Sequence, residues 1–123
     1  MLSKHRLMAF IATRDARRAR EFYEKILGLR VISDDDYAIA VDANGTMLRI
    51  QKVAEFAPHS FTALGWEIPD IGSTVKELSE RGIQFERFPG MGQDARGVWH
   101  SPSGAHVAWF KDPDGNTLSL TQL

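Results

Sequence analysis

The chain has 123 residues, of which 43% are hydrophobic and 25% are charged. This length suits one folded domain, and this balance is typical of a globular protein rather than of a disordered or fibrous one. Fifteen basic residues stand against sixteen acidic ones, a formal net charge of −1, so no basic excess favours nucleic acid. We therefore expect a single domain over residues 1–123 that binds neither DNA nor RNA.

The sequence contains no cysteine, which excludes disulfides, zinc–thiolate sites and thiol nucleophiles. Any metal site would have to use histidine and carboxylate ligands. No apolar run is long enough for a signal peptide or a membrane span. We expect a cytoplasmic protein that does not enter a membrane.

The first half of the chain predicts one strand, one helix and three further strands. Residues 7–12 form a short apolar run, typical of a strand buried on both faces. A helix is predicted near Arg14–Leu27, with Thr13 or Asp15 as its N-cap and Gly28 as its stop. The further strands, which flank an acidic turn and an Asn-Gly hairpin signal, are predicted at Leu29–Ser33, Tyr37–Val41 and Thr46–Lys52.

The second half repeats this order. A strand at Phe61–Ile68 precedes a helix near Ile71–Arg81. The spacing from Asp70 to Gly82 nearly matches that from Asp15 to Gly28, each time through a capped helix, which indicates an internal repeat. The remaining strands are predicted at Ile83–Phe88, Gly97–His100, His106–Lys111 and Thr117–Thr121. The repeat divides the chain into module one, residues 1–56, and module two, residues 61–123.

Each module carries a recognisable motif. Module one has Arg14-Asp15, Glu21-Phe22-Tyr23 and Ile26-Leu27-Gly28-Leu29, and module two has Trp109-Phe110-Lys111-Asp112-Pro113-Asp114-Gly115-Asn116. In this order and spacing they resemble the paired signatures of the glyoxalase/bleomycin-resistance/dioxygenase superfamily, the vicinal oxygen chelate proteins. The resemblance implies an α+β fold of two βαβββ modules whose curved mixed sheets surround a cavity, with the helices outside. It also implies a homodimer.

In many members of that superfamily the cavity holds one divalent metal, ligated from four strands. The resemblance places the ligand positions on Met8, Ala63, Ser119 and the cavity face of Thr46–Lys52. No carboxylate or imidazole, the donors such metals prefer, stands at these positions. We therefore expect neither a metal nor another cofactor. The alternative is a non-standard metal site built from Glu67 and the four histidines, His5, His59, His100 and His106.

Strand alternation indicates which residues face the cavity. Leu48 and Ile50 fit the core, so their neighbours on the strand face the cavity, and Leu118 and Leu120 leave Ser119 on that side in the same way. We assign no catalytic residue. The predicted ligand-binding residues are Met8, Phe10, Met47, Arg49, Gln51, Glu67, Trp99, Trp109 and Ser119.

Two residue types in this set carry chemistry. A guanidinium on a cavity wall, here Arg49, can select an anionic ligand, and the alternative is an internal salt bridge with Glu67 or with an aspartate. Trp99 and Trp109 can supply the aromatic contacts of a small-molecule pocket, although Trp99 also fits a partly exposed packing residue. The acidic run 34–36 is expected to stay solvated, without chemistry.

Three functions remain open. The absent metal ligands favour binding of a small aromatic or anionic molecule without a metal, as in drug-sequestering members of the superfamily. The alternative is a metal-dependent glyoxalase-type lyase or ring-cleaving dioxygenase with a rearranged metal site. In a third reading the pocket is filled by side chains and the domain acts through a partner.

Overall fold

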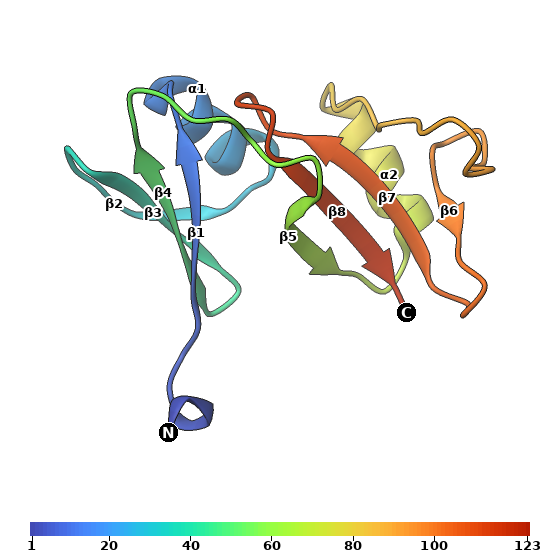
Figure 1. Cartoon of the computed structure of the whole chain (residues 1–123), viewed down its shortest axis with the longest axis horizontal. Helices are drawn as coiled ribbons and strands as arrows, with labels where there is room; N and C mark the ends of the chain where they lie inside the picture. The colour runs from blue at the N-terminus through green and yellow to red at the C-terminus, as the bar shows by residue number, and fades with distance from the viewer. The chain divides into compact units, whose positions relative to one another are not determined.

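The computed structural model describes the whole chain, residues 1–123, as two compact units, Met1–Ala57 and Pro58–Leu123. Each unit contains one four-stranded mixed sheet and one main helical segment (Figure 1). The chain is an α+β protein of two βαβββ modules, as the sequence predicts. No helix is both long enough and apolar enough to cross a membrane.

Module one begins with a short 3-10 turn at Leu2–Lys4. Its strands are β1 (Met8–Thr13), β2 (Arg30–Asp34), β3 (Ala38–Ala43) and β4 (Thr46–Lys52), arranged β1-β4-β3-β2. β1 runs parallel to β4, whereas β3 is antiparallel to both of its neighbours. Asn44 and Gly45 have positive φ angles of 51° and 95°, as the predicted hairpin between β3 and β4 requires.

The helix of module one consists of α1 (Ala16–Arg20) and a π-helical continuation, η2 (Glu21–Ile26). Asp15, rather than Thr13, is the N-cap, and its side chain accepts the Arg18 N–H at 3.2 Å. This bond satisfies one of the free N–H groups of the first turn. The carboxylate therefore fixes where the helix begins.

The π-helical turn shifts the helix register before it ends. The Leu27 N–H donates to the Phe22 carbonyl and the Leu29 N–H to the Tyr23 carbonyl, at 3.0 and 2.9 Å. Phe22 and Tyr23 are both buried and meet edge to face. The sequence predicts a helix here but not its type. A π-helical hydrogen bond spans only one residue more than an α-helical one, and the spacing of apolar residues does not distinguish the two. Gly28, with φ +75°, ends the helix as predicted.

The large core residues of module one lie on one face of its sheet, and on the other face only the small Ala38 and Ala40 of β3 are buried. Ile11, Ile50 and Ile39 are neighbours in register across three strands, and all are buried. The expectation that β1 is buried on both faces is wrong, because Met8 and Phe10 on its other face are 44% and 53% exposed. An apolar run does not distinguish a doubly buried strand from one whose second face is apolar but open.

Module two repeats the plan. Its strands are β5 (Thr62–Glu67), β6 (Trp99–His100), β7 (His106–Lys111) and β8 (Thr117–Gln122), arranged β5-β8-β7-β6. The helix α2 (Ile71–Glu80) begins at Asp70, whose side chain accepts the Ser73 N–H at 3.3 Å. The Ile71 N–H donates to the Gln122 side chain at 2.9 Å, which ties α2 to β8.

The predicted strand at Ile83–Phe88 is not formed. The one backbone hydrogen bond between this segment and β7 runs from the Glu86 N–H to the Trp109 carbonyl, at 2.7 Å. The Phe88 N–H donates instead to the side chain of Gln93 at 2.7 Å. Pro89 follows and has no N–H to continue a ladder. Local residue pattern favoured a strand, and the absence of further pairing partners overrides it.

The core of module two lies between α2 and its sheet, where Val75 of α2 and Ala108, Phe110, Leu118 and Leu120 of the sheet are buried. The motif at 112–116 closes the hairpin between β7 and β8. The Asp112 carboxylate accepts the N–H groups of Asp114 and Asn116, each at 2.9 Å, and the Asn116 side chain at 2.9 Å. This carboxylate serves the turn rather than a reaction.

Candidate functional site

The predicted site residues of module one share one face of its sheet. We call the face of each sheet opposite its buried core the open face. Leu48 and Ile50 lie in the core, as alternation predicts. The open-face residues, in register across β1 and β4, are Met8 with Met47, Phe10 with Arg49, and Ala12 with Gln51. The structure thus brings five predicted residues together, and their role in binding stays a prediction.

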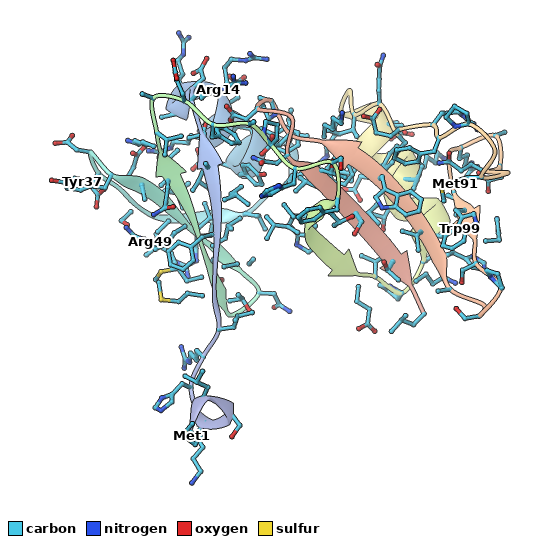
Figure 2. The ribbon with its side chains drawn as sticks, viewed as in Figure 1. Met1, Arg14, Tyr37, Arg49, Met91 and Trp99 are labelled. Atoms are coloured by element: carbon cyan, nitrogen blue, oxygen red, sulfur yellow. The ribbon has the colours of Figure 1, made fainter.

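Arg49 is half-buried beside Phe10 (Figure 2). It makes no hydrogen bond or ion pair within module one. The pKa of Asp35 lies below its usual range mainly because the Tyr37 and Ala38 N–H groups bind its carboxylate, and the Arg49 charge adds to this effect. The salt bridge with an aspartate is therefore not formed in this module. The guanidinium remains available to an anion.

The acidic turn next to this face has a structural role. The Asp34 carboxylate accepts the Lys52 ammonium at 2.6 Å and the Arg20 guanidinium at 2.9 Å. These two hydrogen bonds, the one from Lys52 first, lower the pKa of Asp34. The sequence predicted that the acidic run stays solvated. In the structure Asp34 instead links β2 to α1 and to β4.

Ser119 lies at the centre of the open face of module two. It is paired directly with Gly65 on β5 and with Trp109 on β7. A Cβ atom at Gly65 would lie 2.7 Å from the Ser119 hydroxyl oxygen, so that hydroxyl occupies the space a larger residue would need. Leu118 and Leu120 are buried on the other face, as alternation predicts.

An aromatic cluster stands beside Ser119. The ring of Trp109 lies 6.1 Å from that of Trp99 and 5.4 Å from that of Phe88, measured between centroids. Trp99 is paired with Val107 on β7 and so shares the open face with Trp109 (Figure 2). We call Phe88, Trp99 and Trp109 the aromatic wall. All three side chains are partly exposed.

Phe88 was missed as a site residue. Alternation within Ile83–Phe88 places Phe85 and Phe88 on opposite sides of the segment. In the structure Phe85 meets the buried Phe110, whereas Phe88 meets Trp109. That alternation was the available signal, and it holds even though the segment is not a strand.

The start of β5 departs from the assumed alternation. Thr62 pairs with Thr117 and Leu64 with Leu118, so the register shifts at Ala63, which has no direct partner. An irregularity of this kind inserts an extra residue and breaks the period of two. Alternation along β5 therefore does not predict which face of the sheet Ala63 lies on. Glu67, beyond the shift, is paired with Thr121 and stays on the open face with Gly65.

The residues at the expected ligand positions do not fit a divalent metal. Met8, Arg49, Ala63 and Ser119 offer a thioether, a guanidinium, a methyl and a hydroxyl, none of which is a carboxylate or imidazole donor. No group of three or more His, Cys, Asp or Glu side chains lies together in the structure. A divalent metal at these positions would therefore lack suitable ligands.

The four histidines do not supply a substitute. His5 lies in the exposed segment before β1, and His59 stacks on Phe61 with ring centroids 4.7 Å apart. His100 and His106 are paired across β6 and β7, with centroids 4.3 Å apart. They lie on a different side of the strands from the aromatic wall, because alternation turns neighbouring residues to opposite faces.

His100 also contacts an acid. Its Nε2 lies 3.2 Å from a carboxylate oxygen of Asp94. Burial alone would raise the pKa of Asp94, but hydrogen bonds from the Val98 N–H, His100 and the Arg96 N–H together lower it. Asp94 thus acts as an acceptor that holds the loop leading into β6.

The chain was compared with protein families and with solved structures. The profile of the Glyoxalase/Bleomycin resistance protein/Dioxygenase superfamily matches residues 5–120. The chain belongs to this superfamily. No curated protein matches the sequence significantly.

Solved structures of the superfamily have the same fold. A glyoxalase family protein from Bacillus anthracis is 16% identical, with a TM-score of 0.76 over 96% of this chain and 93% of that one. A lactoylglutathione lyase from Agrobacterium tumefaciens is 14% identical, with a TM-score of 0.74 over 94% and 91%. A superfamily member from Sphaerobacter thermophilus is 24% identical, with a TM-score of 0.74 over 97% of each chain. At these identities the likeness extends to the fold alone.

Proposed function

We propose that this superfamily member binds a small aromatic or anionic molecule without a divalent metal at the superfamily's ligand positions. The aromatic wall carries the proposal. Its rings are partly exposed on the open face of module two, where flat apolar surface can stack on a ligand ring. Beside it, the buried Ser119 packs its hydroxyl against Gly65, which has no side chain.

Arg49 supplies the second element of the proposal. A guanidinium offers a fixed fork of N–H donors to a carboxylate or phosphate, and this one has no partner in its module. Phe10 and Met47 next to it give the open face an apolar lining. We propose that Arg49 is the main anion-recognition group.

We further propose that the protein works as a cytoplasmic homodimer. The exposed apolar residues at and just before β1, above all Phe10 and Leu7, support an association between copies, since surface of this kind is typical of interfaces. Twofold association is the commonest oligomer. Light scattering that gives a monomer at micromolar concentration would contradict the dimer.

Binding can be tested with phenylacetate, an aromatic carboxylate, followed by NMR of the tryptophan indole N–H groups. Phenylacetate should shift the signals of Trp99 and Trp109, and acetate and phenylacetamide should bind more weakly because each lacks one recognised group. Arg49→Glu should abolish the advantage of phenylacetate over phenylacetamide. Arg18→Glu, an exposed arginine of α1, is the matched control. Absence of any shift with millimolar phenylacetate or phenyl phosphate would overturn the proposal.

Two further measurements test its other parts. Elemental analysis of protein purified without a histidine tag should find no stoichiometric divalent metal, and a full equivalent would overturn the metal-free reading. A double-mutant cycle of Trp99→Ala and Trp109→Ala tests the aromatic wall. Two rings that hold the same ligand should show coupled losses of binding free energy, whereas strictly additive losses would contradict their joint role.

A further inference from the structure

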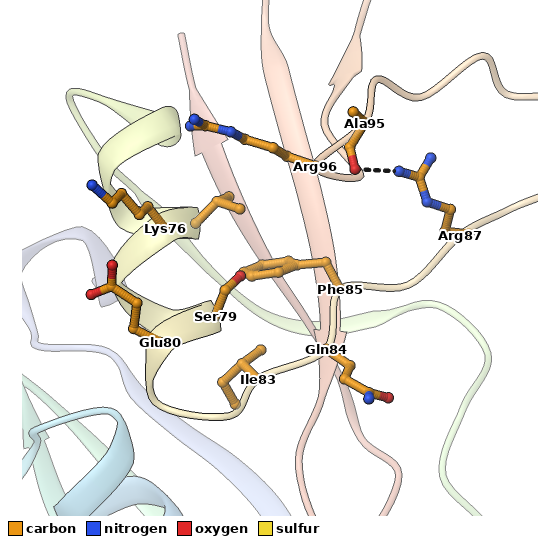
Figure 3. Close-up of a pocket in the computed structure, with 10 residues that line it drawn as sticks. Lys76, Ser79, Glu80, Ile83, Gln84, Phe85, Arg87, Ala95 and Arg96 are labelled. Carbon is orange, nitrogen blue, oxygen red and sulfur yellow. Dashed lines mark hydrogen bonds between the residues drawn. The ribbon is translucent and has the colours of Figure 1, made fainter.

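Module two contains a groove between α2 and the segment that follows it (Figure 3). Its volume is about 650 Å³, which lies within the range typical of small-molecule sites. The lining residues are Val75, Lys76, Ser79, Glu80, Ile83, Gln84, Phe85, Arg87, Ala95 and Arg96.

The groove lies away from the aromatic wall. Phe85, which lines it, meets Phe110 edge to face at 5.5 Å, and Phe110 is buried in the core beneath α2. Trp109, the next residue to Phe110 on β7, faces the opposite side of the sheet with the aromatic wall. The groove is therefore a separate feature of module two.

Module one has no equivalent of the segment that forms this groove. There the helix ends close to Gly28, and β2 begins at Arg30. In module two α2 ends at Glu80, whereas β6 begins only at Trp99. The long connection forms the second wall of the groove, so this feature departs from the internal repeat.

Side-chain hydrogen bonds hold that wall in place. The Arg87 guanidinium donates to the carbonyls of Asp94 and Ala95, each at 2.7 Å. The Gln93 amide donates to the carbonyls of Glu86 and Gly97, at 2.9 and 2.7 Å. A wall tied at these points needs little ordering when a ligand binds, and low ordering cost favours affinity.

The charge of the lining favours an anion. Lys76, Arg87 and Arg96 are cationic, and Glu80 is the only carboxylate among the lining residues. The Arg87 guanidinium is occupied by backbone carbonyls, but the Lys76 ammonium makes no hydrogen bond or ion pair. The Arg96 guanidinium donates only to the Gly72 carbonyl, at 3.3 Å. In Figure 3 the charged ends of Lys76 and Arg96 both lie at the α2 side of the groove. Two cations are thus available on the same side.

The rest of the lining suits an apolar group. Val75, Ile83 and Phe85 supply aliphatic and aromatic surface, and Ser79 adds a hydroxyl to the lining. We propose that this groove is a second binding site, for a small amphipathic anion. A phosphate or carboxylate would be held by Lys76 and Arg96, and an attached ring or short aliphatic group would lie on Ile83 and Phe85.

The probe for this site is phenyl phosphate, titrated into the full chain and followed by amide NMR. We expect shifts at Ser79, Gln84 and Phe85, and weaker binding of inorganic phosphate because it leaves the apolar surface unused. Lys76→Glu combined with Arg96→Glu should raise the Kd of this site at least about tenfold. Glu80→Gln should lower that Kd, because it removes the one repelling carboxylate, and a merely unfolded variant would not bind more tightly.

Arg49→Glu, on β4 of module one, is the control, and it should leave the Kd of the groove unchanged. An unchanged groove Kd in the charge-reversed double variant would overturn the proposal. Equal binding of inorganic phosphate and phenyl phosphate would overturn its amphipathic part. Shifts confined to the aromatic wall would show that phenyl phosphate uses only the other site, and would also overturn it.

Discussion

Gly65 and Ser119 face each other across β5 and β8, so closely that a Cβ atom at Gly65 would lie 2.7 Å from the Ser119 hydroxyl oxygen. Apart from chain neighbours, the only other atom within 4 Å of that position is the Ser119 carbonyl oxygen, at 3.7 Å. The conflict is therefore confined to one hydroxyl. Trp109 is the next residue in the same register, so this pair sets the space beside the aromatic wall.

The effect of Gly65→Ala on the free energy of unfolding should depend on the residue at position 119. Alanine in a strand is favoured over glycine by about 0.5–1 kcal/mol, but here the methyl group displaces the Ser119 hydroxyl at a similar cost. We expect little change in unfolding free energy for the single variant and a gain of about 0.5–1 kcal/mol in the Ser119→Ala background. Urea denaturation of the four proteins in the cycle measures this coupling. Equal effects of Gly65→Ala in both backgrounds would show that the close approach is relieved elsewhere.

Much of this fold could be predicted because its local signals agree with its tertiary structure. Asp15 and Asp70 cap the two helices, as each residue's place before an amphipathic stretch indicated. Leu48 and Ile50 are buried, so alternation correctly placed Arg49 on the open face. These features depend on residues close in sequence, which pattern analysis can detect.

The remaining features depend on partners that a local pattern does not contain. The extra residue at Ala63 follows from how β5 pairs with β8, and alternation within β5 alone does not show it. Phe88 lies in the aromatic wall where the Glu86 N–H binds the Trp109 carbonyl and the Phe88 N–H binds Gln93, contacts that a local pattern does not contain. Whether Arg49 pairs with an aspartate likewise depended on where the acidic turn lies, and there Asp34 binds Lys52 instead.

The cap of α2 can be tested by substitution. Asp70→Ala should lower the free energy of unfolding by about 1 kcal/mol, because the Ser73 N–H loses its acceptor. Asp70→Asn keeps an acceptor oxygen and should cost much less. Chemical denaturation followed by circular dichroism compares the two. If the asparagine variant loses as much stability as the alanine variant, the charge or another contact of Asp70 is responsible rather than the cap.

The tryptophans can separate the two faces of module two. Trp99 and Trp109 belong to the aromatic wall, whereas Trp66 is paired with Leu120 and shares its side of the sheet. Phenylacetate binding should therefore change the fluorescence of the first two. Trp109→Phe should reduce the change, and the matched control Trp66→Phe should preserve it. A response carried entirely by Trp66 would place the ligand on the helix side and contradict the proposed site.

Asp34 provides a pH-dependent test of module one. Its pKa is lowered in the folded protein by hydrogen bonds from Lys52 and Arg20. A carboxyl whose folded-state pKa is depressed stabilises the fold above its unfolded-state pKa, and this stabilisation is lost as the pH falls through the folded-state value.

Asp34→Asn should therefore lower the free energy of unfolding at neutral pH by about 1 kcal/mol or less, since both ion pairs are partly exposed. The penalty should shrink towards zero as the pH falls through the lowered folded-state pKa of Asp34, below which the wild-type carboxyl is also neutral. Molar salt should reduce it at neutral pH by screening. Asp36→Asn, in the same turn but without an ion pair, is the control, and it should show little change across the pH range. Urea denaturation at several pH values distinguishes the two variants. If the loss of stability in Asp34→Asn persists unchanged in acid, the amide disrupts the turn itself, and the loss of the charge is not the cause.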